Sequence, residues 1–302
     1  MKRLLLLGAL LALSGSSAQA LRLPNAPRCP IFPKTNAWNQ RVDRLPVAAN
    51  SDTVIASIGA ETGLHPDFGS GLWVGGRIGI PYDVVTKWTP RSKVTFDYAD
   101  ESDRGPYPIP AHVHVESGSD RHALLIDRDA CKLYELFALA HTATGWHAGS
   151  GAIWSLRSNR LRPAAWTSAD AAGLPIFPGL ARYDEVARGR IDHALRFTVQ
   201  RTRRAYVAPA RHYASSLTDP NLPPMGLRVR LKASFDVAGF PPQARAVLVA
   251  LKRYGMLVAD NGSSWYISGA PSAKWDNDDL HTLGRVKGSD FEVVQTGPVV
   301  VP

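Results

Sequence analysis

The chain contains only two cysteines, Cys29 and Cys131. In an oxidising compartment two cysteines most simply form one disulfide. Closing a loop of about 100 residues would stabilise the fold by about 4–5 kcal/mol in the chain-entropy model. A zinc site is the alternative, although neither cysteine has a CxxC partner or a nearby histidine. A link of this span ties the N-terminal segment to the middle of the chain, so it favours one continuous domain over two.

The first twenty residues indicate the destination of the chain. Met1, Lys2 and Arg3 form a basic start, residues 4–13 are apolar, and residues 18–20 read Ala-Gln-Ala, the small-residue pattern of a cleavage site. We therefore expect residues 1–20 to be a signal peptide and the mature protein to be secreted or periplasmic. No later apolar run approaches the roughly 18 residues of a membrane helix, so we expect no membrane partner.

Short strands dominate the rest of the sequence. The 25 glycines and 23 prolines are typical of a chain with many turns. The β-type runs between them are Thr53–Ile58, Leu72–Ile80, Lys93–Tyr98, His122–Asp127, Lys132–Leu139, Ala152–Leu156, Ala194–Val199, Ala205–Val207 and Leu227–Phe235. Along residues 227–232 apolar and basic residues alternate, which predicts one buried face and one positively charged, exposed face.

Two patterns near the C-terminus are more specific. Residues 241–254 predict a helix that proline opens and Gly255 ends. Residues 256–260 and 264–268 predict two strands joined by the tight turn Asn261-Gly262. We also expect a short helix over 280–286, with Asp279 as its N-cap, and a last strand over 291–294.

These patterns predict a mainly β fold. We expect a single β-sandwich or jelly-roll-like domain over residues 51–302 with a few short helices, preceded by an extended arm over residues 21–50.

Residues 166–185 are an irregular segment that contains three acids, Asp170, Asp184 and Glu185. Long segments broken by glycine and proline often form the wall of a site. A pair of carboxylates is what glycosidic cleavage needs, one to protonate the leaving oxygen and one to attack or to activate water. We therefore predict these acids as catalytic and Trp166 and Tyr183 as substrate contacts; the alternative is that the acids serve solubility or helix capping.

A second group of polar residues follows at 193–213. His193, Arg211 and His212 are predicted to support the acids, and Arg196, Tyr213 and Lys232 to bind substrate. Arg211, His212, Tyr213 and Lys232 also form the residue set of a polysaccharide lyase, which neutralises a uronate and removes a proton. Each of these residues could equally be structural.

His112 and His114 lie two positions apart in the sequence AHVHVE. On a strand both side chains would point to one face, a geometry that can hold zinc, copper or iron, with His122 or His141 as a third ligand. The alternative is a pair of exposed histidines in a loop, and apart from this possible metal ion we expect no cofactor.

Two stretches, AWTSADAAGLPIFPGLARYDE at 165–185 and LKASFDVAGFPPQARAVLVALKRYGMLVADNGSSWYISG at 231–269, resemble a family of secreted bacterial proteins that is largely uncharacterised. The resemblance covers most of the mature chain. It implies an exported single domain and brings no activity and no catalytic residue.

No nucleotide-binding or classical hydrolase motif is present, and basic residues are dispersed, so we expect no nucleic-acid partner. Export, scattered tryptophans and the acidic segment predict a monomeric carbohydrate-active enzyme, a glycoside hydrolase or lyase. The net charge of +9 suits a polysaccharide that includes acidic sugars. The alternatives are a non-catalytic glycan-binding or surface protein and a metal-dependent enzyme that uses His112 and His114.

Overall fold

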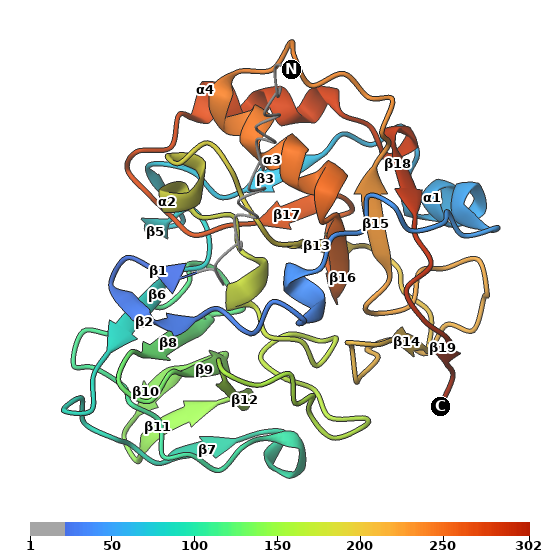
Figure 1. The fold of residues 1–302 in the computed structure, drawn as a ribbon. Coiled ribbons are helices and arrows are strands. Elements are labelled where there is room, and N and C mark those ends of the chain that lie inside the picture. The colour runs from blue at the N-terminus through green and yellow to red at the C-terminus, as the bar shows by residue number, and fades with distance from the viewer. Residues whose placement is uncertain (1–21) are drawn as a thin grey trace, which may run out of the picture.

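The computed structural model describes residues 22–302 (Figure 1). The predicted signal peptide lies outside the described residues. The prediction of a mainly β fold is confirmed, and the strands form several sheets with four short α-helices. None of the helices in the described part of the chain has the length and apolar character to cross a bilayer.

The strands are β1 (Arg22–Leu23), β2 (Ala26–Pro30), β3 (His65–Asp67), β4 (Leu72–Trp73), β5 (Gly76–Arg77), β6 (Tyr82–Val85), β7 (Val94–Phe96), β8 (Ala123–Asp127), β9 (Lys132–Phe137), β10 (Ala140–Thr142), β11 (Gly145–Ala148), β12 (Ser150–Ser155), β13 (Leu195–Val199), β14 (Tyr206–Val207), β15 (Arg228–Leu231), β16 (Met256–Asn261), β17 (Tyr266–Ser268), β18 (Phe291–Val293) and β19 (Val299–Val300). The helices are α1 (Ser51–Ile58), α2 (Tyr183–Val186), α3 (Pro242–Arg253) and α4 (Asn277–His281), with short 3-10 turns between them.

The largest sheet has six strands in the order β18-β15-β16-β13-β17-β3, with parallel pairs β13–β16 and β17–β3. Phe197 and Ile267, which pair across β13 and β17, belong to a large apolar core that also contains residues of α3 and α4. Their neighbours Arg196 and Ser268 lie on the opposite face, because successive side chains of a strand alternate. One face of this sheet is therefore apolar, and the other presents polar groups.

The second sheet has the order β12-β9-β8-β6 and lies below the six-stranded sheet in the view of Figure 1. Leu124 packs on one of its faces, in a core that includes Cys29 of β2, and Leu125 packs on the other. The predicted disulfide is confirmed: Cys29 and Cys131 are bonded, with their Cα atoms 5.2 Å apart. It fastens β2 to the turn between β8 and β9, in keeping with a compartment outside the cytoplasm.

Several local predictions are wrong, among them the N-cap of α4, which is Asp276 and not Asp279. Residues 53–58, predicted as a strand, belong to α1, because Val54, Ile55 and Ile58 recur at helical spacing and face the core. The strands β16 and β17, predicted to form a hairpin, do not pair with each other; β13 lies between them and pairs with both. The Asn-Gly pair therefore connects two strands that sit on either side of a third.

The alternating strand β15 was predicted to expose its basic face, and this too is wrong. Arg228 and Arg230 are both buried. Arg228 donates hydrogen bonds to the carbonyl oxygens of Ala37, Gln40 and Tyr254 at 2.5–3.1 Å, and Arg230 pairs with Glu292 at 2.7 Å. The segment that precedes α1 covers this face of the sheet, and the arginines bind its backbone.

We predict that Arg228→Ala lowers the free energy of unfolding by about 3 kcal/mol or more, since it removes these bonds from three carbonyl oxygens and leaves a cavity. Arg245→Ala, on the exposed side of α3, is the matched control and should change stability by less than about 0.5 kcal/mol. Urea denaturation followed by circular dichroism measures both. Equal effects of the two substitutions would contradict this role of Arg228.

Candidate functional site

A buried ion pair lies on the polar face of the six-stranded sheet. Arg196 of β13 donates from Nε to Oδ2 of Asp170 and from Nη2 to Oδ1, both at 2.8 Å, and its Nη1 bonds to Ser268. Both partners are at least 95% buried. The Asp170 carboxylate outweighs the effect of burial and raises the pKa of Arg196, so the guanidinium stays charged. The pair carries no net charge.

Asp260 stands next to this pair. It pairs in register with Thr198, two residues beyond Arg196 on β13, so it shares the face of the ion pair. Its Oδ2 lies 3.7 Å from Nη2 of Arg196, and its side chain is 25% exposed. Burial and, next, the negative charge of Asp170 raise the pKa of Asp260 to about 7, against the attraction of Arg196. This carboxyl group therefore keeps its proton up to near-neutral pH.

A pocket of about 250 Å³ adjoins these groups: Asp260 is partly exposed in it, whereas Asp170 is buried in its wall. Its polar lining includes Glu101, Thr167, Asp170, His212 and Asp260. Glu101 accepts a hydrogen bond from the backbone N–H of Thr167 at 2.8 Å, and its Oε2 lies 4.0 Å from Nε2 of His212. The ring of His212 is fixed by a hydrogen bond between Nδ1 and the carbonyl oxygen of Ala171 at 2.8 Å. Two partly exposed carboxyl groups, Glu101 and Asp260, thus share one pocket.

The loop that carries Asp170 is held by buried groups of the four-stranded sheet. Glu135 of β9 accepts hydrogen bonds from the backbone N–H groups of Ile176 and Phe177 at 2.8–3.0 Å. Burial raises the pKa of Glu135 to about 7, although these bonds favour the charged form. Ser150 of β12 donates to the carbonyl oxygen of Ser168 at 2.6 Å.

His122 binds the same loop from the start of β8. Its Nδ1 contacts Glu116 at 2.5 Å and its Nε2 lies 3.0 Å from the carbonyl oxygen of Ala169. Burial disfavours the charged ring, but the Glu116 carboxylate outweighs it and raises the pKa of His122 to about 9. A protonated ring donates at both nitrogens, which fixes the backbone next to Asp170.

The structure brings together three of the residues that the sequence singled out. Asp170 and His212 line the pocket, and Arg196 holds Asp170. Arg196 was predicted as a substrate contact, but it is buried and both ends of its guanidinium are engaged by the protein. It acts on the site through Asp170 and Asp260.

Glu185 and His193 lie apart from the pocket, in a sealed cluster. Glu185 contacts Arg182 at 2.8 Å and Nε2 of His193 at 3.0 Å, and all three side chains are almost fully buried. The positive charge of Arg182, followed by His193, outweighs burial and lowers the pKa of Glu185. Asp184 of α2 pairs at 3.1 Å with Arg188, which follows the end of that helix. These partners indicate structural roles for both acids and for His193.

The other predicted contacts are dispersed. Arg211 donates from Nε to the carbonyl oxygen of Arg162 at 3.0 Å. Tyr213 stacks on His212 with ring centroids 5.5 Å apart. Lys232 donates to the carbonyl oxygen of Ser289 at 2.8 Å.

The two predicted aromatic contacts also lie outside the pocket. Tyr183 packs edge-on against the ring of Trp275, with centroids 5.3 Å apart. Trp166 lies at a neighbouring cleft, with its ring 5.4 Å from the guanidinium carbon of Arg162. Of the residues proposed for a lyase, only His212 lines the pocket.

His112 and His114 lie in a turn and loop rather than on a strand, and both are exposed. Nδ1 of His114 is 2.6 Å from Asp83. The two histidines that were predicted as a third ligand have other partners. His122 is buried against Glu116, and His141 packs on Trp146. Across residues 22–302 no group of three or more His, Cys, Asp and Glu side chains is placed to hold a metal ion.

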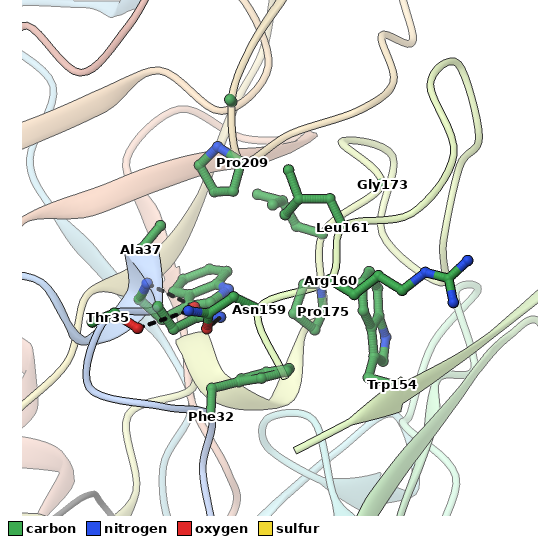
Figure 2. Close-up of a pocket in the computed structure, with 14 residues that line it drawn as sticks. Phe32, Thr35, Ala37, Trp154, Asn159, Arg160, Leu161, Gly173, Pro175 and Pro209 are labelled. Carbon is green, nitrogen blue, oxygen red and sulfur yellow. Dashed lines mark hydrogen bonds between the residues drawn. The ribbon is translucent and has the colours of Figure 1, made fainter. Parts of the chain in front are cut away.

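A separate cleft of about 270 Å³ is mostly apolar (Figure 2). Phe32, Trp154, Leu161 and Pro175 are among its walls, and Arg160 is the one charged residue in its lining. With so few ionisable groups, this cleft is a poorer candidate for acid–base chemistry than the pocket around Asp260.

Sequence reasoning missed Asp260, Glu101 and Glu135. Asp260 follows four buried residues of β16, and an acid at the end of a buried strand is a signal that could have been used. Glu135 lies between Leu133 and Phe137 in a run that is otherwise apolar or aromatic, which marks a buried carboxyl group. Glu101 sits in a polar loop, and nothing in its sequence neighbourhood distinguishes it.

Comparisons of the chain with protein-family models, with curated proteins and with solved structures find no match.

The raised pKa of Asp260 predicts how stability depends on pH. In the unfolded chain its carboxyl group loses its proton near the ordinary value of 3.8, but in the folded protein only near 7. Between these values the folded state binds more protons, so stability falls as pH rises. Asparagine does not ionise. We compare the free energy of unfolding of Asp260→Asn with that of the wild type at pH 4 and at about pH 8. The difference should shift in favour of the variant by about 1–3 kcal/mol as the pH rises between these values.

Urea denaturation at both pH values measures this difference. Asp184→Asn, whose carboxylate pairs with Arg188 near the surface, is the control and should show no such gain. A gain in Asp260→Asn no larger than that in the control would show that Asp260 titrates normally.

Proposed function

We propose that this protein is an extracytoplasmic glycoside hydrolase that cleaves a polysaccharide, with Asp260 as the general acid and Glu101 as the second carboxylate. The observation that carries the proposal is the shared pocket of Asp260 and Glu101, in which Asp260 has a pKa raised to about 7. Glycosidic cleavage needs one protonated and one ionised carboxyl group on either side of the bond.

Asp260 suits the role of the acid. A general acid works best when its pKa lies near the working pH, because it is then protonated and still a ready donor. Asp170 supports this state by its negative charge, while its own charge is balanced by Arg196. Asp170 is thus a positioning residue in this proposal, rather than the acid or the nucleophile.

Glu101 is placed for the role of the second carboxylate. The N–H of Thr167 donates to it at 2.8 Å, and Nε2 of His212 lies 4.0 Å from its Oε2. Glu101 would attack the anomeric carbon or take a proton from water, and His212 would orient it. The separation between the two carboxyl groups with substrate bound decides between retention and inversion.

The charges of the pocket favour hydrolysis over the lyase reaction. A lyase must neutralise a uronate, but the Arg196 guanidinium is already bound to Asp170, and Lys232 binds the carbonyl oxygen of Ser289. At the point of cleavage a neutral sugar is the better fit. A glycan-binding protein without activity stays the second candidate, because the same pocket could hold a sugar without cleaving it.

We take the four- and six-stranded sheets as a sandwich-like scaffold within a single domain. The protein would act as a secreted or periplasmic monomer, without nucleic acid or membrane as a partner. No observation favours a lyase, or a metal-dependent enzyme that uses His112 and His114, over the hydrolase proposed here.

We predict that the purified protein releases new reducing ends from at least one polysaccharide in a panel of neutral and acidic polymers. Asp260→Asn should lower kcat by about 100-fold or more, because the leaving oxygen loses its proton donor. Glu101→Gln should do the same. The basic limb of the pH–rate profile of the wild type should lie near pH 7, the pKa of Asp260.

Asp184→Asn serves as the control and should keep wild-type activity, since its carboxylate pairs with Arg188 outside the pocket. Saturable glycan binding without any product would favour the non-catalytic candidate. Full activity of Asp260→Asn would remove the assignment of the acid.

A further inference from the structure

A basic cleft of about 390 Å³ lies beside the proposed catalytic pocket. Its charged lining consists of Lys132, Arg160, Arg162 and Asp103. Arg162 is buried and contacts Asp103 at 2.6 Å, so these two charges balance each other. Lys132 and Arg160 are exposed, and within residues 22–302 neither forms an ion pair. The cleft therefore offers two uncompensated positive charges.

Aromatic rings form the rest of the recognition surface. The guanidinium carbon of Arg162 lies 5.5 Å from the ring centre of Trp154 and 5.4 Å from that of Trp166. Trp166 is only partly buried, so one ring is available to a ligand. Flat indole rings in a groove provide apolar contact area and a polar N–H, which suits a sugar ring.

One polar atom at this cleft has no partner in the protein. Trp154 is 94% buried, and no acceptor in the described chain meets its Nε1. Buried N–H groups are nearly always hydrogen-bonded, so an unpaired one indicates an acceptor supplied from outside. In Figure 2 Arg160 extends beside Trp154, where the basic cleft adjoins the apolar one. Trp154 lines both clefts, so a ligand oxygen bound there is the candidate acceptor for its N–H.

The cleft and the catalytic pocket share a wall. Arg162 donates to the carbonyl oxygens of Glu101 and Thr167, both at 2.7 Å, and both residues line the catalytic pocket. A polymer that occupies the pocket would therefore have its next units close to Trp166 and Arg160.

We propose that the basic cleft binds an anionic sugar unit, in which Lys132 and Arg160 attract the carboxylate or sulfate, Trp166 packs on the ring and Trp154 donates to an oxygen. Its role as a neighbouring subsite for the cleaved polymer rests on the proposed function; the binding itself does not. The substrate would then be a polysaccharide that is cleaved at a neutral unit and recognised through an acidic one.

The test is calorimetric titration of the full mature protein with three probes: trigalacturonate, a sulfated carrageenan oligosaccharide and neutral maltotriose. We expect saturable binding of one or both anionic probes, weakened by added salt, and no measurable binding of maltotriose. The double variant Lys132→Ala/Arg160→Ala and the single variant Trp166→Ala should each weaken binding about tenfold or more. Arg245→Ala, which removes an exposed charge on α3, should bind as the wild type.

Each outcome is decisive. Preference for the carboxylate or for the sulfate identifies the anion. Absence of anionic binding, equal binding of maltotriose, or unchanged affinity in the Lys132/Arg160 and Trp166 variants would overturn the inference. Asp260→Asn separates it from the proposed function: anionic binding that persists in an inactive protein supports the cleft even if no polysaccharide is hydrolysed. Hydrolysis that does not depend on sugar charge would keep the hydrolase assignment and would overturn the role of the cleft as a subsite for the cleaved polymer.

Discussion

The bidentate ion pair between Arg196 and Asp170 is the interaction on which the rest of the site depends. Removing two charges from water costs several kcal/mol for each ion, and only close pairing with further hydrogen bonds offsets that cost. Arg196 is on a central strand of the six-stranded sheet, whereas the Asp170 loop is bound by His122 and Glu135 of the other sheet. The pair thus joins the two sheets and places the Asp170 carboxylate near Asp260.

Local patterns predicted the elements that are stabilised locally. The helix α3 was placed to within one residue at each end, because proline and glycine mark its limits and its apolar residues keep helical spacing. The pairing of β16 with β13 depends on a partner about 60 residues away, and no periodicity in β16 indicates it. The burial of Arg228 was unpredictable for the same reason: the carbonyl oxygens of Ala37 and Gln40 that bind it come from the opposite end of the chain.

The candidate site shows the same contrast between features that a local pattern predicts and features that contacts between distant residues decide. Asp170 was found because it lies in a long irregular segment, a common wall of sites, and His212 because it lies in the polar segment that follows. Glu185 lies in the first of those segments and yet faces Arg182 inside the protein, so an irregular segment alone does not say which of its acids reach solvent. Asp260 was missed because its raised pKa arises from burial and, next, from the charge of Asp170, and the sequence reveals neither. Residue type predicted the kind of chemistry, and the packing of the two sheets decided which residues carry it.

The account is tested most directly by a carbon-13 NMR titration of protein labelled only at aspartate carboxyl groups. It predicts one signal that titrates near pH 7, is absent from Asp260→Asn, and moves to a lower pKa when Asp170→Asn removes the neighbouring charge. If the Asp260 signal titrates near the ordinary aspartate value of 3.8 in the wild type, the pocket holds no proton donor at neutral pH, and the central claim is contradicted.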